Sequence, residues 1–272
     1  MSDVAVLQER LLEYMGRLPS CAVAFSAGVD SSVVAKAAAL ALGERAVAVT
    51  GVSPSLAEGE LDEARRMAQL IGIRHVEIAT NEMELPAYAE NSPDRCYHCK
   101  NELYWRIKDL REQLQVELII NGANADDLFD YRPGMRAAGE QEVVSPLADC
   151  GLTKQDVRAL ARNWELPIWD KPATPCLSSR IAYGEAVTPE RLAMIDRGEQ
   201  FLRQHGFGTV RVRYHKGDLA RIEVPLEELP RLMSDDLRPQ VVHCLHELGF
   251  KFVTIDIQGF RSGSLNVLLP TL

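Results

Sequence analysis

The segment 26–32 places small residues, hydroxyls and one carboxylate together where a predicted strand meets a predicted helix. The beginning of a helix presents unpaired backbone N–H groups and a partial positive charge, which suit a phosphate group. Serine hydroxyls add donors, and the carboxylate of Asp30 suits a divalent cation that bridges phosphates, such as Mg²⁺. The segment is neither G-x-x-x-x-G-K-[ST] nor G-x-G-x-x-G, and its alternative interpretation is an ordinary Ser/Asp helix cap. The residues that we predict to bind phosphate are Ser26, Gly28, Asp30, Ser31 and Ser32.

Three of the six cysteines occupy positions that could hold a metal. Cys96 and Cys99 form a C-x-x-C pair, and Cys176 follows in a loop that Pro175 stiffens. Zinc would need a fourth ligand, and His98 lies inside the C-x-x-C loop, from which it would reach the same metal awkwardly. In a 4Fe–4S cluster, three cysteines would leave one iron open to bind sulfide or substrate. The residues themselves leave zinc and a 4Fe–4S cluster both open.

The other three cysteines give no comparable signal. Cys21 stands in a predicted strand and Cys244 on the apolar side of a predicted helix, so we expect both to be small core residues. Cys150 falls in a loop, where the sequence assigns it no role. Six cysteines in 272 residues are too few for a disulfide scaffold, so we expect them to be reduced or bound to metal.

Charged residues alternate with apolar ones along two predicted strands in the last quarter of the chain. Arg211 and Arg213 share one face of the first strand, and Arg221 and Glu223 alternate in the same way along the second. Arginine suits bidentate capture of phosphate or carboxylate, whereas the alternative is a solvated sheet face. Glu199 lies within the apolar stripe of a predicted helix, where a carboxylate needs an arginine or a metal as its partner.

Strands and helices alternate through roughly the first 165 residues. Short apolar runs are typical of strands buried in a parallel sheet, and this order favours an α/β fold with helices on both faces. In such a Rossmann-like sheet, ligands bind at the carboxyl ends of the strands, where segment 26–32 lies. We expect helices at 4–17, 33–42, 57–71, 100–114 and 153–163, and strands at 21–25, 45–51, 75–80, 117–122 and 143–147.

A proline-punctuated stretch, 164–176, ends this alternation and marks the predicted domain boundary. We therefore expect one domain at 1–165 and a second at 166–272. Two alternating strands around a short Lys-Gly-Asp turn indicate a hairpin in the second domain, which we expect to be a small, mostly antiparallel α+β domain. Its expected elements are helices at 188–205, 226–233 and 237–248 and strands at 209–215, 219–224 and 252–257.

The composition excludes several classes of protein. There are 30 Lys and Arg residues against 39 Asp and Glu residues, which gives a net charge of −9 and argues against a nucleic-acid partner. The sequence contains no apolar run long enough to cross a membrane and no signal-peptide core. We therefore expect a soluble, cytoplasmic protein.

Segment 26–32 resembles the S-G-G-x-D-S pyrophosphate-binding loop (PP-loop) of the ATP pyrophosphatase superfamily, which has the adenine nucleotide alpha hydrolase-like fold. Members cleave ATP between its α- and β-phosphates and transfer AMP to an oxygen atom of the substrate. Ala27 departs from the pattern, and its Cβ is costly only if the backbone there has a positive φ. Residues 121–127, which include Gly122, match a second loop on the nucleotide side in such proteins.

The resemblance narrows at four further motifs, 91–100, 130–134, 176–184 and 209–215, which look like those of the LarE family. These enzymes use ATP to build the nickel-pincer nucleotide cofactor of lactate racemase. The resemblance implies adenylation of a carboxylate of pyridinium-3,5-biscarboxylic acid mononucleotide, followed by its conversion to a thiocarboxylate with release of AMP and pyrophosphate. It also implies self-association into a homo-oligomer.

The resemblance further implies a role for individual residues. Members with three cysteines at the matching positions hold a 4Fe–4S cluster that carries an additional sulfide, whose source the sequence leaves open. The implied catalytic residues are Cys96, Cys99, Cys176 and Asp30, with the three cysteines as cluster ligands, and the implied substrate, phosphate or metal contacts are Arg180, Glu199, Arg211, Arg213 and Glu223. Two alternatives remain, a tRNA thiolase with the same loop and a non-catalytic nucleotide or metal sensor.

Overall fold

The computed structural model describes residues 3–129, 133–172 and 174–268. The chain forms two compact units, which we call unit 1 and unit 2. Unit 1 comprises Met1–Ser53, Glu58–Glu82 and Cys96–Thr174, and unit 2 comprises Pro54–Ala57, Met83–Arg95 and Pro175–Leu272. The domain boundary that the sequence suggests at residue 165 stays a prediction.

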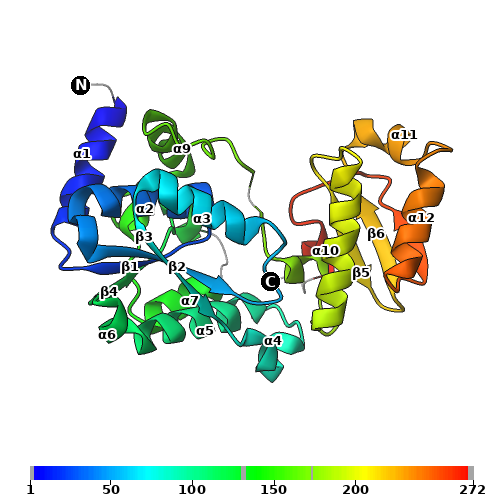
Figure 1. Cartoon of the computed structure of the whole chain (residues 1–272), viewed down its shortest axis with the longest axis horizontal. Helices are drawn as coiled ribbons and strands as arrows, with labels where there is room; N and C mark the ends of the chain where they lie inside the picture. The colour runs from blue at the N-terminus through cyan, green and yellow to red at the C-terminus, as the bar shows by residue number, and fades with distance from the viewer. Residues whose placement is uncertain (1–2, 130–132, 173, 269–272) are drawn as a thin grey trace. The chain divides into compact units, whose positions relative to one another are not determined.

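Within its described residues, unit 1 is built on a parallel sheet with the strand order β3-β2-β1-β4 (Figure 1). Strand β1 is central, so that Val23 lies between Ala48 of β2 and Ile120 of β4, and every residue of β1 is buried. This parallel sheet confirms the predicted α/β fold. Because helices cover both faces of a parallel sheet, a central strand such as β1 needs apolar residues on both of its faces. The strands are β1 (Cys21–Ala24), β2 (Ala46–Val52), β3 (Arg74–Ala79) and β4 (Leu118–Ile120).

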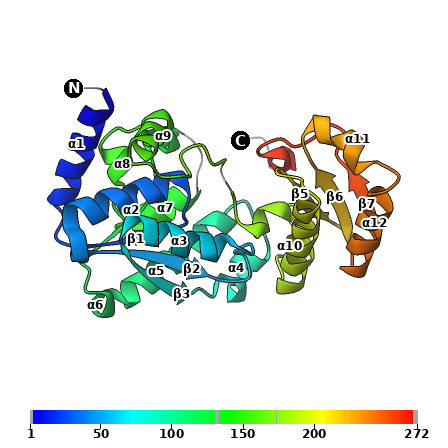
Figure 2. The ribbon, with the colours of Figure 1, turned by 45° about the horizontal axis from the view of Figure 1, so that its top comes forward.

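Helices cover both faces of this sheet (Figures 1 and 2). Successive side chains of a strand point to opposite faces, so Val23 joins an apolar core with α1, α2, α3 and α9, whereas Ala22 joins another with α5, α6 and α7. No described helix is both long enough and apolar enough to cross a membrane. The helices are α1 (Asp3–Gly16), α2 (Val29–Leu42), α3 (Glu60–Ile71), α5 (Arg95–Asp109), α6 (Arg111–Leu114), α7 (Pro133–Glu140) and α9 (Lys154–Asn163).

Two sequence predictions for unit 1 are corrected. The fifth strand at 143–147 is wrong, because in the described chain Val144 forms only an isolated parallel bridge with Ile120 before helix α8 (Pro146–Asp149) begins. Pro146 has no N–H for a strand ladder, and its fixed φ suits the first turn of a helix. The helix expected at 100–114 begins earlier, at Arg95, so the C-x-x-C pair lies in the first turn of α5.

Unit 2 contains a sheet with the order β5-β6-β7 among its described residues. Strands β5 and β6 are antiparallel, and their turn uses left-handed conformations at Gly217 (φ 82°) and Asp218 (φ 58°). Strand β7 runs parallel to β6, so the expectation of a mostly antiparallel sheet is corrected to a mixed one. The reason is that helix α12 lies between the two strands and forms a strand–helix–strand crossover, which produces parallel neighbours. The elements are α4 (Pro86–Ala89), α10 (Pro189–Gln204), β5 (Arg211–His215), β6 (Leu219–Glu223), α11 (Leu229–Leu232), α12 (Arg238–Glu247) and β7 (Phe252–Ile255).

Candidate functional site

The PP-loop (residues 26–32) follows β1 and includes the first turn of α2, and hydrogen bonds of its serines fold it back on itself. The backbone N–H of Ser26 donates to Ser31 Oγ at 3.3 Å, and Ser31 Oγ donates to the carbonyl oxygen of Gly28 at 3.1 Å. Gly28 is the N-cap residue of α2, so the unpaired N–H groups of the helix begin directly after it. The hydroxyl of Ser32 is buried and has no hydrogen-bond partner among the described residues. The loop therefore offers backbone and hydroxyl donors where a phosphate would sit.

Ala27 adopts a left-handed backbone conformation with φ 53° and is completely buried. A residue with a Cβ costs about 1–2 kcal/mol in this conformation relative to its usual range. Ala27, which stands where the superfamily motif has glycine, therefore has a strained backbone, and contacts of the surrounding loop must keep it in this conformation. Strain of this kind is common where a loop is shaped for a ligand.

Asp30 lies in the first turn of α2 and is held by two residues from distant parts of unit 1. Lys154 Nζ donates to Asp30 Oδ2, and Asn124 Nδ2 donates to Asp30 Oδ1 at 3.1 Å. The backbone N–H of Lys154 donates in turn to Asp126 Oδ2 at 2.9 Å, which fixes the start of α9 against the second loop. Sequence reasoning missed Lys154. The only available signal was its place at the start of the helix predicted at 153–163, directly after Thr153, which is the N-cap residue of α9 and forms a capping box with Asp156.

Gly122 supports the PP-loop by close packing. A Cβ at this position would lie 2.7 Å from the backbone nitrogen of Ser31 and 3.0 Å from the carbonyl carbon of Asp30. Only glycine allows the second loop to approach the start of α2 this closely. The ATP contact predicted for Gly122 stays a prediction, and the structure adds this packing role.

The structure separates the cysteines by burial in the way that the sequence suggests for most of them. Burial raises the pKa of the Cys21 thiol to about 12 and also raises the pKa of Cys150 and of the half-buried Cys244. In contrast, Cys96 is exposed, and Cys99 and Cys176 are half-buried. Cys96 and Cys99 belong to unit 1 and Cys176 to unit 2. Cys244, which the sequence predicts to be a core residue, is half-buried like Cys99 and Cys176, so burial alone does not set it apart from them.

The accessible cysteines lie at the ends of helices. Cys96 and Cys99 are three residues apart in the first turn of α5, a spacing that puts both on one helix face. Cys176 is the N-cap residue of a 3₁₀ helix at Leu177–Arg180. Within each unit, the described residues contain no group of three or more His, Cys, Asp or Glu side chains that could hold a metal. Accessible thiols are nevertheless the ligands that an iron–sulfur cluster requires, so the donor chemistry fits such a cluster.

Glu199 is completely buried in unit 2. The sequence predicts an arginine or a metal as its partner, and the structure shows arginines. Its Oε1 accepts from Arg180 Nε at 3.0 Å and from the backbone N–H of Val212 at 3.2 Å. Its Oε2 accepts from Arg180 Nη2 at 3.2 Å and from Arg203 Nη2 at 2.6 Å. A carboxylate without such partners would be very costly at this depth.

Glu223 is also completely buried, on the neighbouring strand β6. Its Oε2 accepts from Arg213 Nε at 3.0 Å and Nη2 at 2.7 Å, and its Oε1 accepts from Arg221 at 3.1 Å and from Ser264 Oγ at 2.6 Å. The face that could have been a solvated sheet surface is therefore a set of packed ion pairs.

Arg211 differs from the other arginines of this face. In the described part of the chain it pairs with no carboxylate, and it donates only to the carbonyl oxygen of Val210, at 2.7 Å, while lying over the ring of Phe260. Its burial and the neighbouring charges of Arg180 and Arg213 lower the pKa of the guanidinium to about 10. A half-buried cation next to other cations is a suitable place for an anion.

A small pocket of about 250 Å³ lies entirely within unit 2. Arg95 and Arg213 line it together with the hydroxyl-bearing Ser179 and Tyr183, and Pro175, the neighbour of Cys176, belongs to its wall. Arg213 Nη1 donates to the carbonyl oxygen of Ser179 at 3.1 Å, which joins strand β5 to this wall. The pocket combines guanidinium groups with hydroxyl donors, as a site for a small polar molecule would, and Glu223 already pairs with Arg213.

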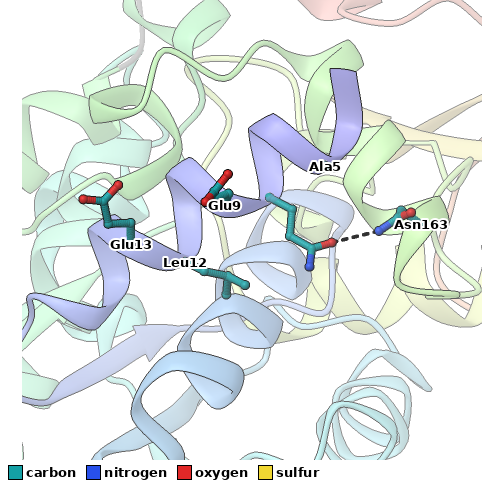
Figure 3. A pocket seen from close by; sticks show the side chains of 6 residues that line it. Ala5, Glu9, Leu12, Glu13 and Asn163 are labelled. Carbon is teal, nitrogen blue, oxygen red and sulfur yellow. Dashed lines mark hydrogen bonds between the residues drawn. The ribbon is translucent and has the colours of Figure 1, made fainter. Parts of the chain in front are cut away.

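A larger cavity, about 730 Å³, lies along α1 in unit 1 and contains no predicted site residue (Figure 3). Its polar lining includes Glu9 and Glu13, and Asn163 of α9 donates to Gln8 of α1 at 2.9 Å. The absence of a cation from this lining makes it unsuitable for a phosphorylated ligand.

The chain is similar to known proteins over most of its length. A family model described as asparagine synthase matches residues 7–162. The pyridinium-3,5-bisthiocarboxylic acid mononucleotide synthase of Lactiplantibacillus plantarum is 34% identical over 267 residues, which cover 98% of this chain and 96% of that protein. An uncharacterized Synechocystis protein, slr1717, is 46% identical over 261 residues, which cover 96% of this chain and 97% of that protein. One component of the glutamine-hydrolyzing GMP synthase of Methanocella arvoryzae is 26% identical over 195 residues, which cover 67% of this chain and 63% of that protein.

The family match contains the whole PP-loop and all four strands of the parallel sheet. The similarity to the Lactiplantibacillus synthase extends through unit 2 as well. Together with the geometry of the PP-loop, these matches show an ATP-dependent enzyme. The chain belongs to the LarE family of the PP-loop superfamily.

Proposed function

We propose that this enzyme is a sulfur transferase that converts a carboxylate of pyridinium-3,5-biscarboxylic acid mononucleotide to a thiocarboxylate. The observation that carries the proposal is the combination of a PP-loop with a C-x-x-C pair and a third cysteine, at 96, 99 and 176, none of which is buried. The name of the Lactiplantibacillus relative, a bisthiocarboxylic acid mononucleotide synthase, agrees with this chemistry.

In the first step, a carboxylate oxygen of the substrate attacks the α-phosphorus of ATP, and the bond to the β-phosphate bridging oxygen breaks. The products are an acyl-adenylate and pyrophosphate. The PP-loop binds the pyrophosphate through the donors of Ser31, Ser32 and the start of α2, and Asp30 holds Mg²⁺. Lys154, now paired with Asp30, supplies a second positive charge for the leaving pyrophosphate. Adenylation is needed because AMP is a far better leaving group than an oxide.

In the second step, sulfide attacks the activated carbonyl carbon. The carbon–oxygen bond to AMP breaks, the thiocarboxylate and AMP form, and the proton of hydrosulfide is released to solvent. A 4Fe–4S cluster bound by Cys96, Cys99 and Cys176 would supply an iron with an open position, at which sulfide is kept as a nucleophile. The chain's own contribution is three accessible thiols in the described units.

We assign binding of the anionic mononucleotide to unit 2. Arg211, which lacks a carboxylate partner in the described residues, receives the phosphate. The pocket lined by Arg95 and Arg213 receives a carboxylate of the pyridinium ring. Glu199 and Glu223 hold the arginine side chains in their orientation rather than touching the substrate. A cytoplasmic homo-oligomer without a nucleic-acid partner completes the proposal.

The test uses the full chain purified without oxygen. It is incubated with ATP, Mg²⁺, the biscarboxylic acid mononucleotide and sodium sulfide, and pyrophosphate, AMP and the sulfur-containing product are measured. We expect pyrophosphate release that depends on the substrate, and a product in which one carboxylate oxygen is replaced by sulfur. Pyrophosphate release without any sulfur-containing product would restrict the enzyme to adenylation, and no substrate-dependent release would overturn the proposal.

Metal analysis of the same preparation tests the cluster. We expect about four irons and four sulfides per chain, lost in Cys176→Ala and kept in the matched control Cys244→Ala, whose thiol belongs to a different helix. One zinc per chain without iron would refute the 4Fe–4S cluster, while the proposed adenylation at the PP-loop would still be tested by pyrophosphate release.

A further inference from the structure

The guanidinium of Arg180 is completely buried and joins two different parts of unit 2. On one side, Nε and Nη2 donate to the two carboxylate oxygens of Glu199 at 3.0 and 3.2 Å. On the other side, Nη1 donates to the carbonyl oxygens of Pro175 and Cys176, the latter at 3.0 Å. Each of the three nitrogens thus donates to a protein acceptor.

Glu199 is itself fixed, because it belongs to the long helix α10 and accepts the backbone N–H of Val212 in strand β5. A buried arginine–carboxylate pair with two parallel hydrogen bonds has a defined geometry. The pair therefore connects the backbone around Cys176 to the helix and sheet of unit 2. Lysine could not replace it, since a single ammonium group cannot span a carboxylate and two carbonyl groups.

The loop that carries Cys176 also makes other backbone hydrogen bonds in the described chain, and those from Arg95 to the carbonyl oxygen of Ser178 (2.8 Å) and from Arg213 to that of Ser179 (3.1 Å) hold residues that follow the cysteine. Leu177 N–H donates to the carbonyl oxygen of Ser55 at 2.9 Å, and Ser179 N–H donates to that of Cys176 at 3.0 Å. Arg180 donates to the carbonyl oxygens of both Pro175 and Cys176. The direction of the Cys176 side chain depends on this backbone.

We propose that Arg180 is a positioning residue for Cys176 and makes no contact with the substrate. Resemblance alone predicts a substrate or phosphate contact for Arg180, and the buried, fully engaged guanidinium supports this different role. The inference rests on the proposed function, because it gives Arg180 importance only through the cysteine that it holds. The proposal also gives two arginines of unit 2 different roles: Arg180 holds the loop, and Arg211 binds the anion.

The first test measures amide hydrogen exchange in residues 177–181 of the full chain without substrate. We expect Arg180→Met to speed exchange there at least tenfold. The matched control is Arg203→Met, which removes the same charge and another partner of Glu199 but has no bond to the cysteine loop. We expect less than a twofold change in the control. Equal effects of the two variants, or no effect of Arg180→Met, would overturn the proposal.

The second test separates positioning from substrate binding by kinetics. Arg180→Lys keeps a charge beside Glu199 and so favours folding even if Arg180→Met does not fold. For Arg180→Lys we expect a kcat for thiocarboxylate formation at least tenfold lower, with the KM for the mononucleotide changed less than twofold. A tenfold rise in KM with unchanged kcat would show substrate contact and overturn the proposal. If the wild-type chain forms no thiocarboxylate, the proposed function fails, while the exchange experiment still decides whether Arg180 holds the loop.

Discussion

Gly122 is the position at which one added methyl group tests how the second loop supports the PP-loop. In Gly122→Ala, the new Cβ would stand 2.7 Å from the nitrogen of Ser31 and 3.0 Å from the carbonyl carbon of Asp30. Both neighbours are backbone atoms at the start of α2, so no flexible side chain can move aside. Relief requires a shift of roughly 0.5–1 Å, and inserting a methyl group into a packed site costs about 1–3 kcal/mol. We expect an unfolding midpoint lower by about 2–12 °C, at about 2–4 °C for each kcal/mol.

The same shift acts on ATP, because it displaces the donors of the PP-loop. A misplacement of about 1 Å in a reactive geometry costs up to about 100-fold in rate, so we expect kcat/KM for ATP to fall between tenfold and 100-fold. The assay is pyrophosphate release at varied ATP and saturating mononucleotide. Gly139→Ala is the control, since a Cβ at Gly139 meets nothing within 4 Å. A Gly122→Ala protein that melts and uses ATP like the control would refute the close approach of the two loops.

Three further predictions follow from the contacts of single residues. Lys154→Ala should lower the rate of pyrophosphate release about tenfold and Lys154→Arg less, in the same assay, because the alanine removes the charge beside the PP-loop. Arg213→Met should lower the unfolding free energy by about 3–5 kcal/mol in urea, since it removes the arginine that donates twice to one oxygen of the buried Glu223 carboxylate. Arg17→Ala, at an exposed ion pair, should change the unfolding free energy by less than about 1 kcal/mol. Burial lowers the pKa of His75, so the free energy of unfolding should be highest above about pH 6.5 and should fall as the pH falls and the unfolded chain binds a proton. Urea unfolding at several pH values should show a smaller decline in His75→Gln.

The sequence predicts those parts of the site that are local in the chain. The PP-loop is a contiguous segment whose chemistry depends on a strand, a turn and a helix that follow one another, so segment 26–32 could be recognised directly. Lys154 could not be recognised, because its contact with Asp30 joins residues 124 positions apart and depends on how α9 packs beside α2. Periodicity identifies the elements but does not place them side by side.

The same limit explains the errors in the fold. The apolar run at 143–147 has the composition of a strand, yet Pro146 starts a helix within it. The direction of β7 relative to β6 depends on the crossover through α12, which residue alternation does not encode. Glu199 shows the intermediate case, since its place in an apolar stripe predicts a charged partner but leaves open which of several arginines provides it. The register of β5 and the path of the chain at Arg180 decide that choice.

The net charge of −9 is compatible with an anionic substrate, because binding depends on the charges close to the site and not on the charge of the whole surface. Charges separated by more than about 8 Å of solvent are largely screened at physiological ionic strength, so the acidic surface as a whole contributes little at the site. The charges close to Arg211 matter more, and those of Arg180, Arg203 and Arg213 act on its guanidinium together with the carboxylate of Glu199. Two of these arginines already share Glu199, and the third pairs with Glu223, whereas Arg211 forms an ion pair with no described carboxylate. A phosphate would therefore complete the ion pairs of this face, which is the physical reason to place it at Arg211.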